Sequence, residues 1–196
     1  MSYSVGLGVD ASLSWEWRLM VLNIEAEVRD LVARRDISKA LMRYIRGQDR
    51  LDKTLHLSAF FDDSYVDCGM LAGSAAEFVD FAQNLLAEFE SSQHILGQMD
   101  ITVDGDSAQG EIYFYAQHRH LKDGQPFDLI ITGRYVDEYA CRGGEWRILK
   151  RFEVIDWVRD DPATDGEFMT ANRGLPLGQR HGKDFSDTRA WPSEST

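Results

Sequence analysis

The sequence predicts an α+β fold in which helices come first in the chain and a curved, mainly antiparallel sheet follows. Three observations support this prediction. Apolar residues recur at helical spacing over the first part of the chain, they alternate with polar residues from His94 onward, and glycine-containing turns interrupt the alternating region at regular intervals. Helices followed by strands, rather than alternating with them, are typical of α+β domains.

The composition is that of one soluble globular domain. The 196 residues leave some excess at the ends, and 43% are hydrophobic and 28% charged. No apolar run approaches the roughly 20 residues that a membrane-spanning helix needs, and residues 1–17 lack the basic and apolar regions of a secretion signal. We therefore expect a cytoplasmic protein with no membrane partner.

Charge and cysteine content narrow the classes of partner. A formal charge of -12 repels phosphate backbones and no cluster of Lys or Arg interrupts it, so nucleic acid is not an expected partner. Cys68 and Cys141 are the two cysteines, and no metal-ligand spacing accompanies them. We expect two free thiols, no metal site and no disulfide.

Two helical segments are predicted near the start of the domain. Val28 and Leu31 belong to the apolar stripe of the first, at 22–34, and the second is expected at 37–49 with Asp36 as its N-cap. An aspartate just before an apolar helical pattern favours a helix start, because its side chain accepts from free N–H groups of the first turn.

Further capping signals follow. Asp52 is positioned to cap a third helix within 53–61, and a short strand is expected at 65–68. Ser74 and Glu77 have the spacing of a capping box, in which each side chain accepts from the other residue's backbone N–H. They predict the start of an amphipathic helix.

The alternating region is divided by turns at 104–106, 122–126 and 142–144. Turns of this length predict an antiparallel meander. The four expected strands lie at 94–103, 107–121, 127–141 and 145–157. Gly110 and Gly133 lie inside strand patterns, where glycine often marks a bulge or a bend.

The periodicity also predicts the organisation of the chain. Residues 21–158 form the expected domain, residues 1–20 precede it as an extension, and residues 159–196 lose all periodicity. Phe168 and Trp191 make the last segment too apolar for a free tail. We expect it to be an irregular arm that docks on the domain or on a neighbouring subunit.

Asp49 continues an apolar helical stripe. Ile37, Leu41 and Ile45 are spaced four residues apart, and the next member of the series is Asp49. A buried carboxylate is costly unless a partner donates hydrogen bonds to it, and a histidine would serve. If the helix ends at Gly47 instead, Asp49 is an exposed loop residue or a cap.

Three histidines have alternative interpretations. His94, at the start of a strand, is either a surface residue or a general base whose tautomer a carboxylate fixes. His118 and His120 share a strand face with Ile112 and Phe114. If that face is concave they line a cavity, and if the strand frays there they are exposed.

The order of the helices, Asp49 near a helix end, His94 at the first long strand and the closing pattern GRYVDEY…GEWRILKR resemble the SnoaL-like group of the nuclear transport factor 2-like superfamily, over residues 22–158. The resemblance implies a cone-shaped fold, with N-terminal helices packed in a strongly curved sheet around a conical pocket. Members include scytalone dehydratase, bile-acid 7α-dehydratase, hexachlorocyclohexane dehydrochlorinase and polyketide cyclases. These use an inward Asp/His pair for proton abstraction without a metal or organic cofactor.

The resemblance carries over to particular positions. Asp49 matches the aspartate that orients the base, and His94 matches the base. His118 matches a second histidine of scytalone dehydratase, and Tyr44 an active-site tyrosine of bile-acid dehydratase. The sequence departs from scytalone dehydratase where that enzyme has two water-binding tyrosines, at Gln48 and Cys68, so its specific reaction is not implied.

The expected function is therefore a cofactor-independent dehydratase or other lyase, isomerase or cyclase, with an apolar small-molecule substrate that includes aromatic and polycyclic compounds. Neutral His94, oriented by Asp49, would take a proton from carbon, and Tyr44 or His118 would donate to a departing oxygen. The alternative is a non-catalytic ligand-binding or structural subunit. The small β-subunits of aromatic-ring hydroxylating dioxygenases, which share the fold, are of that kind.

A homo-oligomer, either a dimer or a trimer, is also expected. Along strand 107–121, Tyr113, Tyr115 and Arg119 are among the residues that alternate with the predicted pocket face. Tyrosine and arginine are enriched at protein interfaces. The outer face of the sheet is thus the predicted contact.

Overall fold

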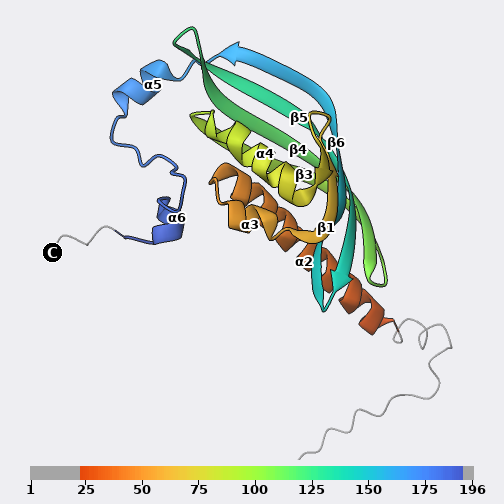
Figure 1. Ribbon diagram of the computed structural model, residues 1–196. Coiled ribbons are helices and arrows are strands. Elements are labelled where there is room, and N and C mark those ends of the chain that lie inside the picture. Colours follow the sequence, from red (N-terminus) through yellow and green to blue (C-terminus); the bar gives the residue numbers. More distant parts are fainter. Residues whose placement is uncertain (1–22, 192–196) are drawn as a thin grey trace, which may run out of the picture.

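The structure is a computed structural model that describes residues 23–191, so the predicted extension at 1–20 lies outside the described residues. The elements are, in chain order, α2 (Ile24–Asp49), α3 (Lys53–Leu57), β1 (Phe60–Asp67), β2 (Ala72–Ser74), α4 (Ala75–Ala87), β3 (Ser91–Asp104), β4 (Ser107–Lys122), β5 (Gln125–Arg142), β6 (Glu145–Pro162), α5 (Gly166–Ala171) and α6 (Phe185–Thr188). Helices α2, α3 and α4 lie within the curve of the sheet, and the segment carrying α5 and α6 returns from the end of β6 toward them (Figure 1).

The sheet has six strands in the order β2-β1-β6-β5-β4-β3. Strands β3 to β6 form the predicted antiparallel meander, with Gly105, Gly124 and Gly143 at positive φ in the turns. The exception to antiparallel pairing is β1, which runs parallel to β6. The predicted α+β fold with a curved, mainly antiparallel sheet is confirmed.

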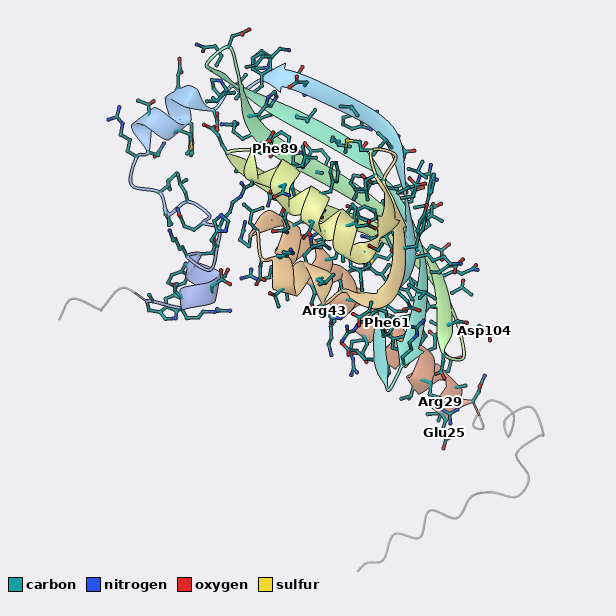
Figure 2. All side chains as sticks on the ribbon, in the orientation of Figure 1. Glu25, Arg29, Arg43, Phe61, Phe89 and Asp104 are labelled. Carbon is teal, nitrogen blue, oxygen red and sulfur yellow. The ribbon has the colours of Figure 1, made fainter. Side chains whose placement is uncertain are left out.

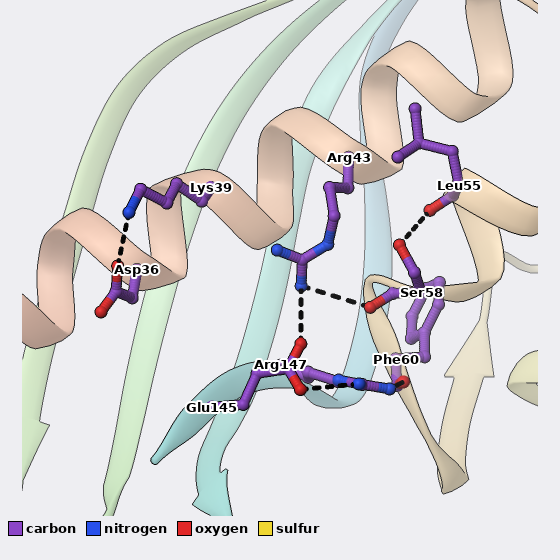
Figure 3. Close-up of polar contacts among 8 residues, drawn as sticks. All are labelled: Asp36, Lys39, Arg43, Leu55, Ser58, Phe60, Glu145 and Arg147. Carbon is purple, nitrogen blue, oxygen red and sulfur yellow. Dashed lines mark hydrogen bonds and ion pairs between the residues drawn. The ribbon is translucent and has the colours of Figure 1, made fainter.

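The prediction of two consecutive N-terminal helices is wrong, because α2 is continuous from Ile24 to Asp49. Asp36 is therefore no N-cap. Its carboxylate accepts hydrogen bonds from Arg35 (3.0 Å) and Lys39 (3.1 Å), the latter visible in Figure 3, and these neighbours hold its pKa at about 2. Because Asp36 forms its hydrogen bonds with side chains of the same helix, it does not start a new one. No glycine or proline lies near Asp36 to break the helix there.

The helix also passes through Gly47, where the sequence left an earlier end open. A Cβ atom built on Gly47 would lie 2.6 Å from Cβ of His56 and closer still to the His56 backbone. Glycine is thus placed here by the close approach of α3, not by a helix end. The consequence is that Asp49 remains on the inward stripe of α2, as the spacing of Ile37 and Leu41 predicts.

Gly47→Ala is expected to lower the free energy of unfolding by about 1–3 kcal/mol, the usual cost of overpacking. At an exposed position within a helix, a glycine-to-alanine change would instead raise the free energy of unfolding by about 1 kcal/mol. Urea denaturation followed by circular dichroism measures the difference. Gly97→Ala is the control, because its added Cβ would meet Tyr113 at an ordinary 3.5 Å. Stability equal to or above the wild-type value in Gly47→Ala would contradict the close approach.

The other two predicted caps, at Asp52 and Ser74, are confirmed. Asp52 accepts from the backbone N of Leu55 (2.9 Å) at the start of α3, which is shorter than expected and ends at Leu57. Ser74 and Glu77 form the reciprocal capping box of α4. Side chains then join the layers: Figure 3 shows the Arg43 guanidinium of α2 between the Ser58 carbonyl and the Glu145 carboxylate.

The two strand glycines have different causes. Gly133 lies at a register shift between β5 and β6, as predicted, and a Cβ there would collide with the Val154 backbone. Gly110 lies in regular pairing on both sides, so of the two alternatives it does not mark a bulge. It instead leaves room for the ring of Tyr139, which would lie 3.1 Å from an added Cβ.

The core contains one fully buried ion pair. Arg151 of β6 donates from Nε (2.8 Å) and Nη2 (2.6 Å) to the two carboxylate oxygens of Asp137 on β5. Its guanidinium also lies 4.1 Å from the ring centroid of Tyr44 and 3.9 Å from that of Tyr135. Both ions are fully buried, so each provides the charge interaction that the other has lost with water.

Candidate active site

Asp49, in the last turn of α2, and His94, near the start of β3, are in direct contact. One Asp49 carboxylate oxygen accepts from the His94 backbone N (2.9 Å), and the other lies 2.7 Å from His94 Nδ1. Both side chains are about nine-tenths buried. Because a carboxylate oxygen can only accept, we assign the ring hydrogen to Nδ1, which leaves Nε2 with a lone pair.

The ring of His94 forms part of the wall of a cavity of about 80 Å³ between α4 and the concave face of β4 to β6. Most of its lining is apolar or aromatic. The lining residues are Gln48, Cys68, Met70, Phe78, Phe81, Ala82, Leu85, Leu86, His94, Phe114, Ala116, His118, Ile131, Tyr135 and Glu153. A volume this small holds about two or three waters, far below the roughly 300–1,000 Å³ of a drug-sized ligand pocket.

An apolar surface continues beyond this cavity on the same sheet face. Val158 and Ile155 of β6 are the cross-strand partners of Ile131 and Gly133. Partners in an antiparallel pair point to one face, so both lie on the concave side with the cavity-lining Ile131. They are 54% and 44% exposed, and Met70 at the cavity wall is 70% exposed. The small cavity thus adjoins an open apolar surface.

His118 joins the pair as predicted for a concave strand face. It is buried, and its ring centroid lies 5.2 Å from that of His94, edge to face. Phe89, seen in Figure 2 at the end of α4 next to the sheet, packs on its other side with centroids 4.9 Å apart. Burial lowers the pKa of His118 to about 4, so the ring is neutral near pH 7. Its Nδ1 has no hydrogen-bond partner among residues 23–191.

Tyr44 is placed elsewhere. Its ring is buried in the core against Phe60, Phe78, Tyr135 and Arg151, and it is not one of the residues that line the cavity. Burial raises its pKa. The structure therefore brings together Asp49, His94 and His118. Tyr44 lies apart from them, in the hydrophobic core.

Sequence reasoning missed Glu153. Along β6, Trp146 and Ile148 face the core, and strict alternation would then place Lys150 and Phe152 inside and Glu153 outside. A bulge at Leu149 breaks the alternation, since Glu138 pairs with Lys150 whereas Tyr139 pairs with Ile148. Glu153 is thereby turned into the cavity. No local signal in the sequence announces this bulge.

Gln48 was identified only as a departure from the family pattern. It is buried and lines the cavity, and its Oε1 has no hydrogen-bond partner within the described part of the chain. An unpaired buried acceptor in the wall of the cavity that His94 also lines is a feature that a bound hydroxyl or water would satisfy.

The arm contacts the domain next to this site. Arg180 donates from Nη1 to the carbonyl oxygens of Phe89 (2.7 Å) and Leu86 (3.1 Å), and from Nη2 to Ser92 Oγ (3.0 Å). The backbone N of the next residue donates to the Arg50 carbonyl (2.9 Å). The arm therefore covers the junction of α4 and β3, two residues from His94.

Two further findings concern the described chain as a whole. Over residues 23–191, no group of three or more His, Cys, Asp or Glu side chains is arranged to hold a metal ion. In the same range, none of the helices combines the length and the apolar character needed to cross a membrane.

Comparisons with known proteins agree on the fold. The family model of the SnoaL-like domain matches residues 29–152. An uncharacterized protein of Mycobacterium tuberculosis is 28% identical over 138 residues, which cover 66% of this chain and 87% of that protein.

Solved structures give the same result. The hexachlorocyclohexane dehydrochlorinase LinA-type3 of Novosphingobium barchaimii superposes with a TM-score of 0.62 at 17% identity, covering 68% of this chain and 93% of that one. A candidate scytalone dehydratase of Novosphingobium aromaticivorans gives 0.60 at 20% identity, covering 69% and 91%. Likeness at these identities shows the fold alone. Because the family model spans more than half of the chain, the protein belongs to the SnoaL-like family.

Proposed function

We propose that this protein is a cofactor-independent acid/base enzyme, most simply a dehydratase or related lyase, that acts on an apolar small molecule. The observation that carries the proposal is the contact between Asp49 and His94 Nδ1 at 2.7 Å, with the ring in the wall of a cavity. A scaffold has no need of a carboxylate–imidazole pair at such a place, whereas proton abstraction from carbon needs one.

The steps follow from the geometry. Asp49 fixes the tautomer, so Nε2 of His94 is the atom that accepts a proton from carbon next to an activating carbonyl. The imidazolium that forms is stabilised by the same carboxylate. The cavity admits only the reacting end of a substrate, and the apolar surface at Ile131, Ile155 and Val158 would carry its body. An aromatic or polycyclic hydroxy ketone has this shape.

The experiment is a panel of β-hydroxy ketones, among them the aldol of acetone and benzaldehyde, whose loss of water creates a conjugated chromophore. Wild-type protein should accelerate the elimination, and His94→Ala should not. Turnover retained in full by His94→Ala would end the proposal. If no substrate is turned over while apolar ketones bind, the result favours the alternative of a ligand-binding or structural subunit.

We also propose that the protein is a homo-oligomer that assembles through the outer face of the sheet. Six large apolar side chains on this face are 38% to 52% exposed: Ile95, Tyr113, Tyr115, Val136, Phe152 and Trp157. Exposed apolar side chains gathered on one face in this number favour an interaction site.

Trp157→Arg is expected to weaken self-association by about a hundredfold or more, the size of effect seen for a central interface aromatic. Sedimentation equilibrium measures the mass. Trp191→Arg is the matched control, because this tryptophan is 73% exposed on the arm. A wild-type protein of single-chain mass at micromolar concentration would contradict the assembly.

A further inference from the structure

We propose that Glu153 is a second catalytic residue of this site, which gives a proton to the oxygen that leaves the substrate while His94 takes the proton from the neighbouring carbon. The inference rests on the proposed function and deepens it, because it assigns the leaving group. It identifies the substrate class as a β-hydroxy carbonyl compound whose hydroxyl enters the small cavity.

The placement of Glu153 is the first support. Its Cα partner across the β5–β6 pair is Tyr135, and both residues line the cavity that His94 and His118 line. The residue is half-buried, and it is one of the residues that line the cavity. A group bound in the cavity would therefore meet His94 and Glu153 together.

The second support is that the half-buried Glu153 carboxyl has no partner that would stabilise its charge. Arg151 is close enough to act on it, but its Nε and Nη2 both donate to Asp137, and its Nη1 forms no hydrogen bond to Glu153 or to any other described residue. Within residues 23–191, the Glu153 carboxyl forms no hydrogen bond and no salt bridge. Burial raises its pKa, and the charge of Arg151 only partly opposes this. An unpaired carboxyl in such surroundings favours its protonated form.

The other cavity groups are poorer acids or carry no spare proton. Burial raises the pKa of Tyr135 well above its usual value, so its hydroxyl holds its proton tightly. His118 is neutral near pH 7, because its pKa lies at about 4. General acids work best with a pKa near the working pH, and burial moves the pKa of the Glu153 carboxyl upward, toward that range. Asp49 differs from Glu153 because it accepts two hydrogen bonds from His94. Asp49 is therefore suited to orient the base, and Glu153 to act as the acid.

The proton and electron balance is complete. His94 Nε2 takes a proton from the carbon next to the carbonyl, and the electrons of that C–H bond form the carbon–carbon double bond. The adjacent C–O bond breaks toward oxygen, and the Glu153 proton converts the departing hydroxyl to water. The imidazolium then returns its proton to the Glu153 carboxylate through the released water, and no oxidant or cofactor is required.

The first test needs no substrate. Infrared spectroscopy at neutral pH should show a carboxylic-acid carbonyl band in the wild-type protein that is absent from Glu153→Gln. Glu138→Gln is the matched control, because Glu138 is an exposed carboxylate paired with Lys150 at 2.9 Å. Its band should match the wild type. Absence of the band from the wild-type protein, or its persistence in Glu153→Gln, would overturn the proposal.

The second test compares leaving groups. The aldol of acetone and benzaldehyde must protonate its hydroxyl to lose it, whereas the corresponding chloride leaves without a proton, and both give the same enone. Glu153→Gln should slow the first reaction by about 10²- to 10⁴-fold, the usual contribution of a positioned acid, and the second by less than about tenfold. Equal slowing of both, or of neither, would overturn the role. Failure of the wild-type protein on both compounds would count against the proposed function, while the infrared result would still decide whether Glu153 holds a proton.

Discussion

Asp49→Asn and His94→Ala should each lower turnover of a hydroxy ketone substrate by about 10²- to 10⁴-fold, with the fold intact. His94→Ala removes the base. Asp49→Asn offers Nδ1 an amide that can present either an oxygen or an N–H group, so the tautomer is no longer fixed and the imidazolium loses its counter-charge. Initial rates of enone formation measure both losses.

The two losses should be strongly non-additive. Residues that act as a unit fail together, so the double variant should be little slower than His94→Ala alone. Wild-type activity should also rise as the pH is raised from acid, because only the neutral ring accepts a proton.

The chain provides a matched control in a second histidine–aspartate pair. His120 Nε2 lies 2.8 Å from Asp160 Oδ1, but this pair is more exposed and does not line the cavity. His120→Ala should leave turnover within about twofold of the wild-type value, as expected for a surface substitution away from the site. Equal loss in His94→Ala and His120→Ala would indicate a general effect on the fold and contradict the catalytic assignment.

Asp137→Ala should lower the free energy of unfolding by about 3–5 kcal/mol, the largest stability effect expected here. The substitution leaves Arg151 fully buried without its counter-ion, and the rings of Tyr44 and Tyr135 replace only part of that interaction. Tyr139 also loses the acceptor of its hydroxyl. Chemical denaturation of the wild-type and variant proteins measures the difference.

Two further variants test the cause. Glu138→Ala removes an exposed partner of Lys150 on the same strands and should cost no more than about 1 kcal/mol. Replacing Asp137 with Leu and Arg151 with Met together should restore much of the lost stability, because neither charge then remains buried alone. A single Asp137→Ala variant as stable as Glu138→Ala would show that water reaches Arg151.

The sequence determined the elements whose cause is local. The spacing of Ile37, Leu41 and Ile45 placed Asp49 inside, the caps at Asp52 and Ser74 fixed two helix starts, and the turn glycines set the meander. These follow from helical and strand periods, from the satisfaction of free N–H groups and from positive φ, all of which act within a few residues.

Tertiary structure decided what depends on a neighbour far along the chain. It made α2 one helix through Gly47, whose missing side chain admits α3, and it joined Asp49 to a histidine 45 residues away. The bulge at Leu149 decided most, because the side-chain period of a strand is two and one extra residue exchanges its faces. Strict alternation would have placed Arg151 and Glu153 on the outer surface. Because of the bulge, Arg151 lies in the core, where it pairs with Asp137, and Glu153 lines the cavity between α4 and the sheet.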